Sequence, residues 1–402
     1  MDRNQKLWIG IGAGALVVLL GLFFYFNRHK SIKKDPTIAE AKKTKEVLHQ
    51  VCAYADSVGI DTTQYTVTTA SIDETNAESV QQEAGEKLTR LMAEIRYGKK
   101  LPKLAYSGQK ETIDTTWIGS IKASDTMVDS LRRLPVFEPY GQLVRHYDRL
   151  RATASKDSLR EIKKTLNFYR WLNRFDNDRF VVVNIPAAEL NVYDKSGKTL
   201  LPMRVIVGKK DTQTPVFTAY MTDIITYPYW NVPEGIAVKE MLPRLQRNPG
   251  YLEEQSLQVL DKNGKEVDPY SIDWNSVSAS NFPYRFRQST GCDNSLGVMK
   301  FNMTSPFAIY MHDTNARSLF SASEDRWRSH GCMRLERPVE LANFLLGEQK
   351  FDAGFLDRCM IDQKPRTFAL PKKFPVFVMY NVADVDASGQ LRFYNNVYNL
   401  AM

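Results

Sequence analysis

Hydrophobic and polar positions divide the chain into three stretches, and the first is an uncharged run near the start. Trp8–Phe26 reads WIGIGAGALVVLLGLFFYF and has no polar face. Its length is close to the roughly 20 apolar residues that a membrane-spanning helix needs. The apolar part of a cleaved signal peptide is usually shorter, and no A-x-A-like cleavage site follows. The run therefore predicts a transmembrane signal anchor, helix 8–26, within a segment 1–34.

The second stretch, residues 35–178, has apolar residues at helical spacing. Several of its periodic segments end near a glycine or before a proline, as helices commonly do. The Met, Leu and aromatic positions are typical of a core, and no acid pair or Gly-rich phosphate loop stands out. The expected helices are Ala39–Ile60, Ala77–Gly98, Thr126–Leu134, Gly141–Ala152 and Lys156–Phe175.

The third stretch begins at Arg179, where helical spacing gives way to short β-rich runs separated by turns. Helices are expected only around Ala237–Leu245 and Pro338–Leu346. The pattern indicates an α+β domain dominated by packed sheets. Within it, residues 233–282 are long and weakly periodic, which fits either an insert or an ordinary surface elaboration. The expected strands read FVVVNIP, ELNVYD, MRVIVG, VFTAYMTDIITY, GVMKFNM, FAIYMHD and FPVFVMYNV.

Composition narrows the class of partner. A chain of 402 residues is long enough for two or three domains. The formal net charge is +8, but the basic residues are spread along the chain and no nucleic-acid module is present. Nucleic acid is therefore not an expected partner. A solvated basic surface, or one that meets an anionic cell-wall polymer, fits the charge better.

The densest candidate chemistry lies between Tyr310 and Arg334. It contains His312 and then the tetrapeptide Ser-His-Gly-Cys at residues 329–332. A thiol is a good nucleophile only as the thiolate, and a nearby histidine can take its proton. His312 and His330 are both candidate bases for Cys332. A glycine beside the thiol lets backbone approach a substrate and lets amides face a developing oxyanion.

Two other interpretations compete with a nucleophile. Cys332 could be an inert buried thiol, or His312, His330 and Cys332 could bind a metal. No CxxC or HExxH accompanies them, so neither a metal nor a cofactor is expected. If Cys332 stays free, at most one disulfide forms among the remaining cysteines, and the sequence does not say which. Those cysteines are Cys52, Cys292 and Cys359.

This stretch resembles the catalytic domain of the L,D-transpeptidases, whose signature is a histidine followed by Ser/Thr-His-Gly-Cys. Further segments look like the large, membrane-anchored members of that family. The helical region, particularly MAEIRYGKKLP, is similar to their N-terminal scaffold domain. The short spacing between Leu150 and Phe175 leaves no room for the peptidoglycan-binding module that many of them carry. The resembling segments are Val181–Asp194, Met203–Lys209, Tyr227–Leu245, Arg285–Met303 and Phe374–Asp386.

The resemblance implies a complete domain plan. The fold class is α+β, with a β-rich catalytic domain of packed mixed sheets over 179–402 and a capping insert at 233–282. A helical scaffold domain over 35–178 and one transmembrane helix precede it. The family works on the cell wall, which implies an inner-membrane anchor with the catalytic domain in the periplasm. Basic residues flanking the run point the other way by the positive-inside rule, and we follow the resemblance.

The resemblance also implies the reaction. The Cys332 thiolate attacks the bond between the diamino acid and D-Ala of a peptidoglycan stem tetrapeptide, releasing D-Ala and leaving a thioester. The amine of a second stem then takes the acyl group, giving a 3→3 cross-link. The family assigns the base to the upstream histidine, hence His312. Ser329 and His330 would shape the loop, and Gly331 with the Cys332 amide would form the oxyanion hole.

Three more residues are candidates for the substrate site. Arg334 could lower the thiol pKa or bind a substrate carboxylate, or it could simply pair with Glu336 or Glu340. Trp230 and Asn231 are expected to line the donor cleft.

Two alternative functions stay open. An L,D-carboxypeptidase would hydrolyse the same bond with the same residues, and a non-catalytic wall-binding scaffold would use the helical domain.

Overall fold

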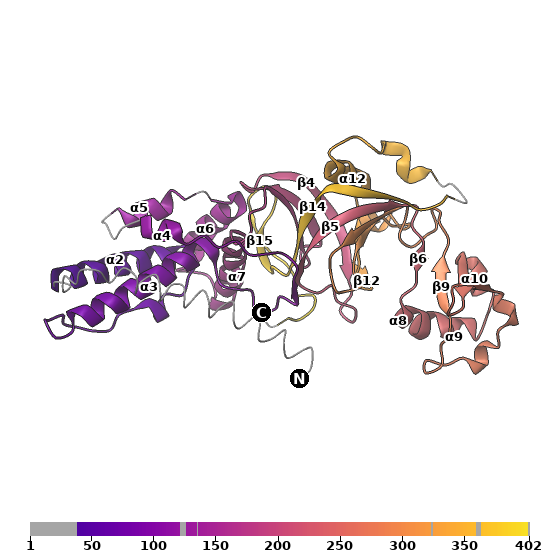
Figure 1. Cartoon of the computed structure of the whole chain (residues 1–402), viewed down its shortest axis with the longest axis horizontal. Coiled ribbons are helices and arrows are strands. Elements are labelled where there is room, and N and C mark those ends of the chain that lie inside the picture. The colour runs from indigo at the N-terminus through magenta and orange to yellow at the C-terminus, as the bar shows by residue number, and fades with distance from the viewer. Residues whose placement is uncertain (1–37, 121–125, 135, 323–324, 359–362, 401–402) are drawn as a thin grey trace.

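The computed structural model describes residues 38–120, 126–134, 136–322, 325–358 and 363–400. Helices lie at one end of the molecule, a β-rich body lies in the middle and a small lobe lies at the other end (Figure 1). The predicted anchor at residues 8–26 falls outside the described residues. Within the described ranges, no helix combines the length and the apolar character that crossing a membrane requires.

This finding corrects two expectations. The fold class becomes a β-rich domain with helices on its N-terminal side, without a transmembrane helix in the part of the chain that the structure describes. The predicted single-pass location in the inner membrane, with its membrane contact through one helix, is not supported. The sequence argument rested on an apolar run alone, and the structure supplies no helix to match it among the described residues.

The predicted N-terminal helices are confirmed, with ends shifted by a few residues. Helix α3 ends where Gly98 takes a φ of +55°, and helix α7 begins at Ser155, whose hydroxyl accepts a hydrogen bond from the Ser158 amide. The helices of this region are α2 (Ile38–Ser57), α3 (Ala77–Tyr97), α4 (Thr116–Ser120), α5 (Met127–Arg132), α6 (Glu138–Leu150) and α7 (Lys156–Leu172), with a 3₁₀ turn η1 (Thr63–Tyr65).

These helices belong to two different cores. Helices α2, α3 and α5 surround an apolar cluster of their own, which includes Leu48, Leu91 and Leu131. Helices α6 and α7 instead pack against the β-rich body and share its main core. The Trp171 ring lies 5.9 Å from the ring of Phe377 on the sheet, centroid to centroid, at nearly a right angle. Helix α7 is therefore structurally part of the β-rich body.

The body is a 10-stranded mixed sheet that closes on itself. Among the described residues its order is β1-β5-β10-β11-β13-β4-β3-β2-β14; β14 also pairs with β5, and the tenth strand, β12, pairs with β4. A closed sheet leaves few exposed edges. The strands are β1 (Tyr106–Ser107), β2 (Arg179–Asn184), β3 (Glu189–Asp194), β4 (Thr199–Gly208), β5 (Phe217–Thr226), β10 (Met299–Met303), β11 (Met311–His312), β12 (Trp327–Ser329), β13 (Met333–Leu335) and β14 (Arg366–Met379).

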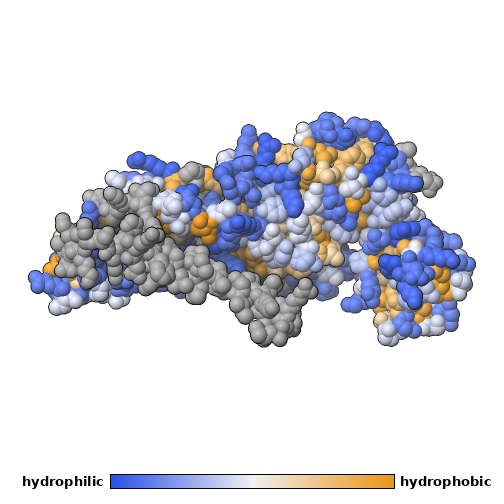
Figure 2. Space-filling view, viewed as in Figure 1, coloured by the Kyte–Doolittle hydropathy of each residue, from blue (hydrophilic) through white to orange (hydrophobic). Residues whose placement is uncertain are grey.

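The lobe at the far end comprises residues 230–288 and is called the insert lobe below (Figure 1). It has a separate sheet, ordered β6-β9-β7-β8, and its own apolar core around Trp274 and Phe286. The space-filling view shows it set off from the body (Figure 2). Its elements are β6 (Trp230–Asn231), α8 (Glu234–Ile236), a π-helical turn η2 (Ala237–Met241), α9 (Leu242–Leu245), α10 (Tyr251–Glu254), β7 (Leu257–Leu260), β8 (Glu266–Val267), η3 (Pro269–Ser271), η4 (Trp274–Ser276) and β9 (Arg285–Gln288).

The C-terminal part completes the body. The helix predicted from Pro338 is confirmed as α12 (Pro338–Leu346) and ends at Gly347, whose φ is +74°. A hairpin of β15 (Ala383–Val385) and β16 (Leu391–Phe393) packs on α7, where the Thr165 hydroxyl donates to the Ala383 carbonyl at 2.5 Å. The remaining elements are α11 (Leu319–Ala322) and η5 (Ala353–Asp357).

Candidate active site

Two short parallel strands bring the predicted catalytic residues together. In the pairing of β11 with β13, Met311 lies beside Met333 and His312 lies beside Arg334. The Met333 amide also donates to the Tyr310 carbonyl at 3.1 Å, which extends the same register towards Cys332. The sheet thus joins two segments that are about 20 residues apart in the sequence.

Side chains alternate between the two faces of these strands. Met311 and Met333 are fully buried in the main core. The residues on either side of each methionine point to the opposite face, where a cavity of about 610 Å³ opens. Tyr310, His312, Cys332 and Arg334 all line that cavity. One pair of strands therefore gathers an imidazole, a thiol, a phenol and a guanidinium on one wall.

The Ser329–Cys332 turn is fixed by hydrogen bonds from both sides. The Ser329 hydroxyl donates to the Cys332 carbonyl at 2.5 Å and accepts from the Gly331 amide at 3.1 Å. The Thr214 hydroxyl donates to the Gly331 carbonyl at 2.8 Å. Gly331 has a φ of +111°, a region that favours glycine. Ser329 is therefore a structural residue of the turn, and the Gly331 amide already has an acceptor.

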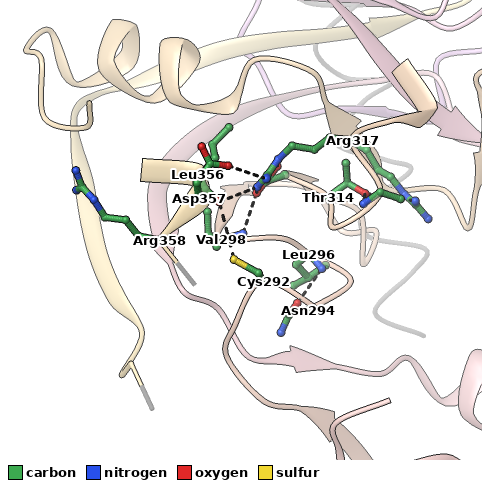
Figure 3. A network of polar contacts seen from close by, with 12 residues as sticks. Cys292, Asn294, Leu296, Val298, Thr314, Arg317, Leu356, Asp357 and Arg358 are labelled. Atoms are coloured by element: carbon green, nitrogen blue, oxygen red, sulfur yellow. Dashed lines mark hydrogen bonds and ion pairs between the residues drawn. The ribbon is translucent and has the colours of Figure 1, made fainter. Parts of the chain in front are cut away.

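A buried ion pair supports the strand that carries His312. The Asp313 carboxylate is fully buried, accepts from the Val298 amide at 2.9 Å and pairs with Arg317 at 2.8 Å. Arg317 also donates to the Leu356 carbonyl at 3.3 Å, and Figure 3 shows this contact. A Cβ atom on Gly297 would lie only 2.2 Å from the Asp313 carboxylate, so glycine is required there.

His312 is a neutral imidazole in this site. Its side chain is 5% exposed, and burial followed by the charge of Arg334 lowers the pKa of His312 to about 3. Backbone hydrogen bonds to Asp313 and Leu296 counteract part of this shift. Nδ1 has no hydrogen-bond partner among the described residues. This nitrogen is therefore available to accept a proton.

Burial favours the protonated form of the Cys332 thiol. Burial raises the pKa of the Cys332 thiol, while hydrogen bonds from Tyr310 and the charges of Lys300 and Arg334 lower it. The thiol contacts the Ala308 carbonyl, with sulfur and oxygen 3.7 Å apart. No hydrogen bond between the Cys332 thiol and His312 is present among the described residues.

Arg334 does not pair with the carboxylates that the sequence suggested. Glu336 binds Arg204, and Glu340 binds Arg337. The Arg334 guanidinium instead faces the cavity and donates weakly to the Thr314 hydroxyl at 3.5 Å. A guanidinium without a carboxylate partner in the described part of the chain is free to meet an anion from outside.

The insert lobe forms the other wall of the cavity. Trp230, Lys239, Glu240 and Arg244 all face the cavity from this lobe. His330, at the start of the catalytic turn, contacts Glu240 with Nε2 and Oε1 2.7 Å apart. Asn231 is exposed and does not line the cavity.

The sequence analysis missed two residues beside the thiol, Tyr310 and Lys300. The Tyr310 hydroxyl accepts a hydrogen bond from the Trp230 indole and donates one to the Cys332 sulfur. Tyr310 could have been found from the sequence, because it lies two residues before His312 in a strand pattern. Lys300 could not, because its place depends on the register between β10 and β11.

The cysteines divide by state. Cys52 and Cys332 are free thiols, and Cys292 is disulfide-bonded. Cys359 lies outside the described residues. Within the described ranges, no group of three or more His, Cys, Asp or Glu side chains is arranged to hold a metal ion.

Comparison with known proteins shows which family the chain resembles. Residues 178–377 match the L,D-transpeptidase catalytic domain family. The chain is also 36% identical over 232 residues to a Haemophilus influenzae protein named "Putative L,D-transpeptidase". That match covers 58% of this chain and 47% of the relative, so the chain spans about half the relative's length. These matches support the expected L,D-transpeptidase catalytic domain, whereas they do not confirm membrane anchoring or an N-terminal scaffold.

Solved structures from the same class are more distant. The catalytic domain of an E. faecium L,D-transpeptidase acylated by ertapenem is 13% identical, with a TM-score of 0.26, covering 50% of this chain and 98% of that one. An L,D-transpeptidase from Mycobacterium smegmatis is 14% identical, with a TM-score of 0.23, covering 51% of this chain and 60% of that one. Likenesses at these TM-scores carry no argument about the site.

Proposed function

We propose that this chain is a peptidoglycan L,D-transpeptidase that works by a cysteine nucleophile. The observation that carries the proposal is the single strand pair that places Cys332, His312 and Arg334 on one wall of a cavity. The match of residues 178–377 to the family supports the reaction class. The substrate is a stem tetrapeptide whose third residue is a diamino acid and whose last is D-Ala.

In the first half-reaction, His312 Nδ1 takes the Cys332 proton and the sulfur attacks the carbonyl before D-Ala. The carbon–nitrogen bond breaks, the D-Ala amine receives the proton from His312, and the acyl group stays on sulfur as a thioester. The Cys332 amide has no acceptor among the described residues, so it is the oxyanion donor that we favour over the engaged Gly331 amide.

In the second half-reaction, the side-chain amine of another stem gives a proton to His312 and attacks the thioester. The new amide forms, the carbon–sulfur bond breaks, and the thiol regains its proton. Water must be kept from the thioester, since attack by water would give hydrolysis instead of a cross-link. The insert lobe, which forms the second wall of the cavity, is placed to limit that access.

Intact-protein mass spectrometry tests the proposal. The full chain is incubated with a disaccharide tetrapeptide, and we expect an adduct with the mass of the donor less D-Ala, located on Cys332. Cys332→Ala should form none, whereas Cys52→Ser, at the other free thiol, should form it normally. A chain that never acquires this adduct would make the proposal wrong and favour a wall-binding scaffold.

Chromatography of the products separates the two enzymatic possibilities. Cross-linked dimers support transpeptidation, whereas disaccharide tripeptides alone, with the adduct present, would assign an L,D-carboxypeptidase.

A further inference from the structure

Lys300 lies on the same face of the sheet as the catalytic residues. It is on β10, and the pairing of β10 with β11 puts Lys300 directly beside His312. Paired residues on neighbouring strands point to the same face. His312 therefore has Lys300 on one side, from β10, and Arg334 on the other, from β13. Two cations bracket the imidazole.

The Lys300 ammonium has no carboxylate partner among the described residues. Its Nζ lies over the Tyr310 ring, 4.2 Å from the ring centroid. Asp223 on β5 is the nearest acid that influences it, but its two oxygens accept from Thr222 at 2.6 Å and Asn302 at 2.7 Å. Partial burial of a cation without a counter-ion is unfavourable, and burial lowers the pKa of Lys300. An anion formed nearby would offset that cost.

The Tyr310 ring links this ammonium to the thiol. The Tyr310 hydroxyl accepts a hydrogen bond from the Trp230 indole and donates one to the Cys332 sulfur. Burial raises the pKa of Tyr310 above its ordinary value, so the phenol keeps its proton at neutral pH and can donate it. A cation over an aromatic ring draws electron density from it, which strengthens the hydroxyl as a donor to sulfur.

We propose that Lys300 is a positioning residue for catalysis, which acts through Tyr310 to stabilise the Cys332 thiolate. The Lys300 ammonium holds the Tyr310 ring in place, and the Tyr310 hydroxyl donates a hydrogen bond to the sulfur anion. The positive charge of Lys300 offsets the negative charge on the sulfur. The groups that act on the thiol are Tyr310, Lys300 and Arg334. The other charged or titratable residues that line the same cavity are Lys239, Glu240, Arg244, His312 and His330. Lys300 and Arg334 both disfavour a protonated His312. The stability of the Cys332 thiolate therefore depends on these two cations more than on a positive charge at His312. The inference rests on the proposed function only in taking Cys332 as the nucleophile.

The test measures thiol acidity without any wall substrate. In a Cys52→Ser background, Cys332 is the one free thiol among the described residues, since Cys292 is disulfide-bonded. The rate of its alkylation by iodoacetamide is followed against pH. We expect Lys300→Met to move the midpoint up by about one pH unit, a roughly tenfold loss of thiolate at neutral pH. Lys300→Arg keeps the positive charge, so its midpoint should lie close to that of the unsubstituted residue. Lys198→Met, at an exposed lysine in the β3–β4 turn, should leave the midpoint in place.

A double substitution tests the route through the ring. Tyr310→Phe alone should raise the midpoint. The double variant with Lys300→Met should show a total shift smaller than the sum of the two single shifts. Thermal unfolding shows which variants are folded, and if Lys300→Met is not, the comparison of Lys300→Gln with Lys300→Arg replaces it. An unchanged midpoint in a folded, uncharged Lys300 variant overturns the inference, and so do strictly additive shifts.

The outcome is separable from that of the proposed function. A shifted midpoint without any acyl adduct would keep the role of Lys300 and remove the transpeptidase. An adduct on Cys332 with an unshifted midpoint would do the reverse.

Discussion

The two walls of the cavity differ in how they are built. The strand wall belongs to the main core, and the backs of its catalytic strands are the fully buried Met311 and Met333. The lobe wall belongs to a separate, smaller core, joined to the body through β6 and β9. Across the cavity, a hydrogen bond joins the His330 ring to the Glu240 carboxylate.

The difference separates two tasks. Residues on the strand wall are held by a closed sheet, so their distances change little unless the body unfolds. The lobe can shift without disturbing that sheet, because the two cores are separate clusters. We infer that the strand wall sets the chemistry and the lobe wall sets access and substrate fit.

The largest effect should come from the strand wall. His312→Gln removes the proton acceptor, and we expect turnover to fall by about 10²- to 10⁴-fold, as for other general bases. Turnover of a disaccharide tetrapeptide measures it. A loss under tenfold would move the base elsewhere, with His330 the first candidate.

The same variant should change how stability depends on pH. The unfolded chain protonates this histidine near its ordinary pKa of 6.5, but the folded chain does so only at about 3. Between those values the unfolded state binds more protons, so the free energy of unfolding falls as the pH falls, by up to about 1.4 kcal/mol per pH unit. Denaturant titrations from pH 7 to pH 4 should show a shallower fall for His312→Gln. Parallel curves would contradict a neutral buried imidazole.

The next effect should come from the core of the lobe. Phe286 is 1% exposed and its ring lies 5.4 Å from that of Phe282. Phe286→Ala should destabilise the lobe by about 3–5 kcal/mol. We expect KM for the tetrapeptide to rise while Cys332 stays reactive to iodoacetamide. Phe393→Ala, at an exposed phenylalanine on β16, is the matched control. Equal loss of thiol reactivity would show that the two walls are one unit.

The smallest effect should come from the hydrogen bond between His330 and Glu240, which joins the two walls. Its side chains are 34% and 41% exposed, and pairs of this kind contribute about 0–1 kcal/mol. Glu240→Gln should therefore change kcat/KM by less than about fivefold. Glu234→Gln, at an exposed position of the same lobe, controls for charge. A change of a hundredfold would give Glu240 a direct part in catalysis.

How far the sequence leads depends on the range of the interaction. Helix α12 was predicted to the residue and the start of helix α7 was predicted exactly, because periodicity and end signals are local; α7 ends three residues earlier than predicted. Cys332 and His312 could be proposed as catalytic residues because a short motif carries them. Lys300 was missed, since no local pattern gives the pairing of β10 with β11. The two partners that the sequence suggested for Arg334 were wrong. Glu336 binds Arg204, which is far from it in the sequence.

The packing of α7 decides where the catalytic body begins as a physical object. Sequence resemblance starts at residue 179, yet Trp171 and Phe175 cover Phe377, and the Tyr169 hydroxyl donates to Asp384 at 2.5 Å. Cutting the chain at residue 179 would expose an aromatic face and remove one of the hydrogen-bond donors to the buried Asp384 carboxylate. Anyone wishing to crystallise or engineer the body alone should therefore keep α6 and α7 attached.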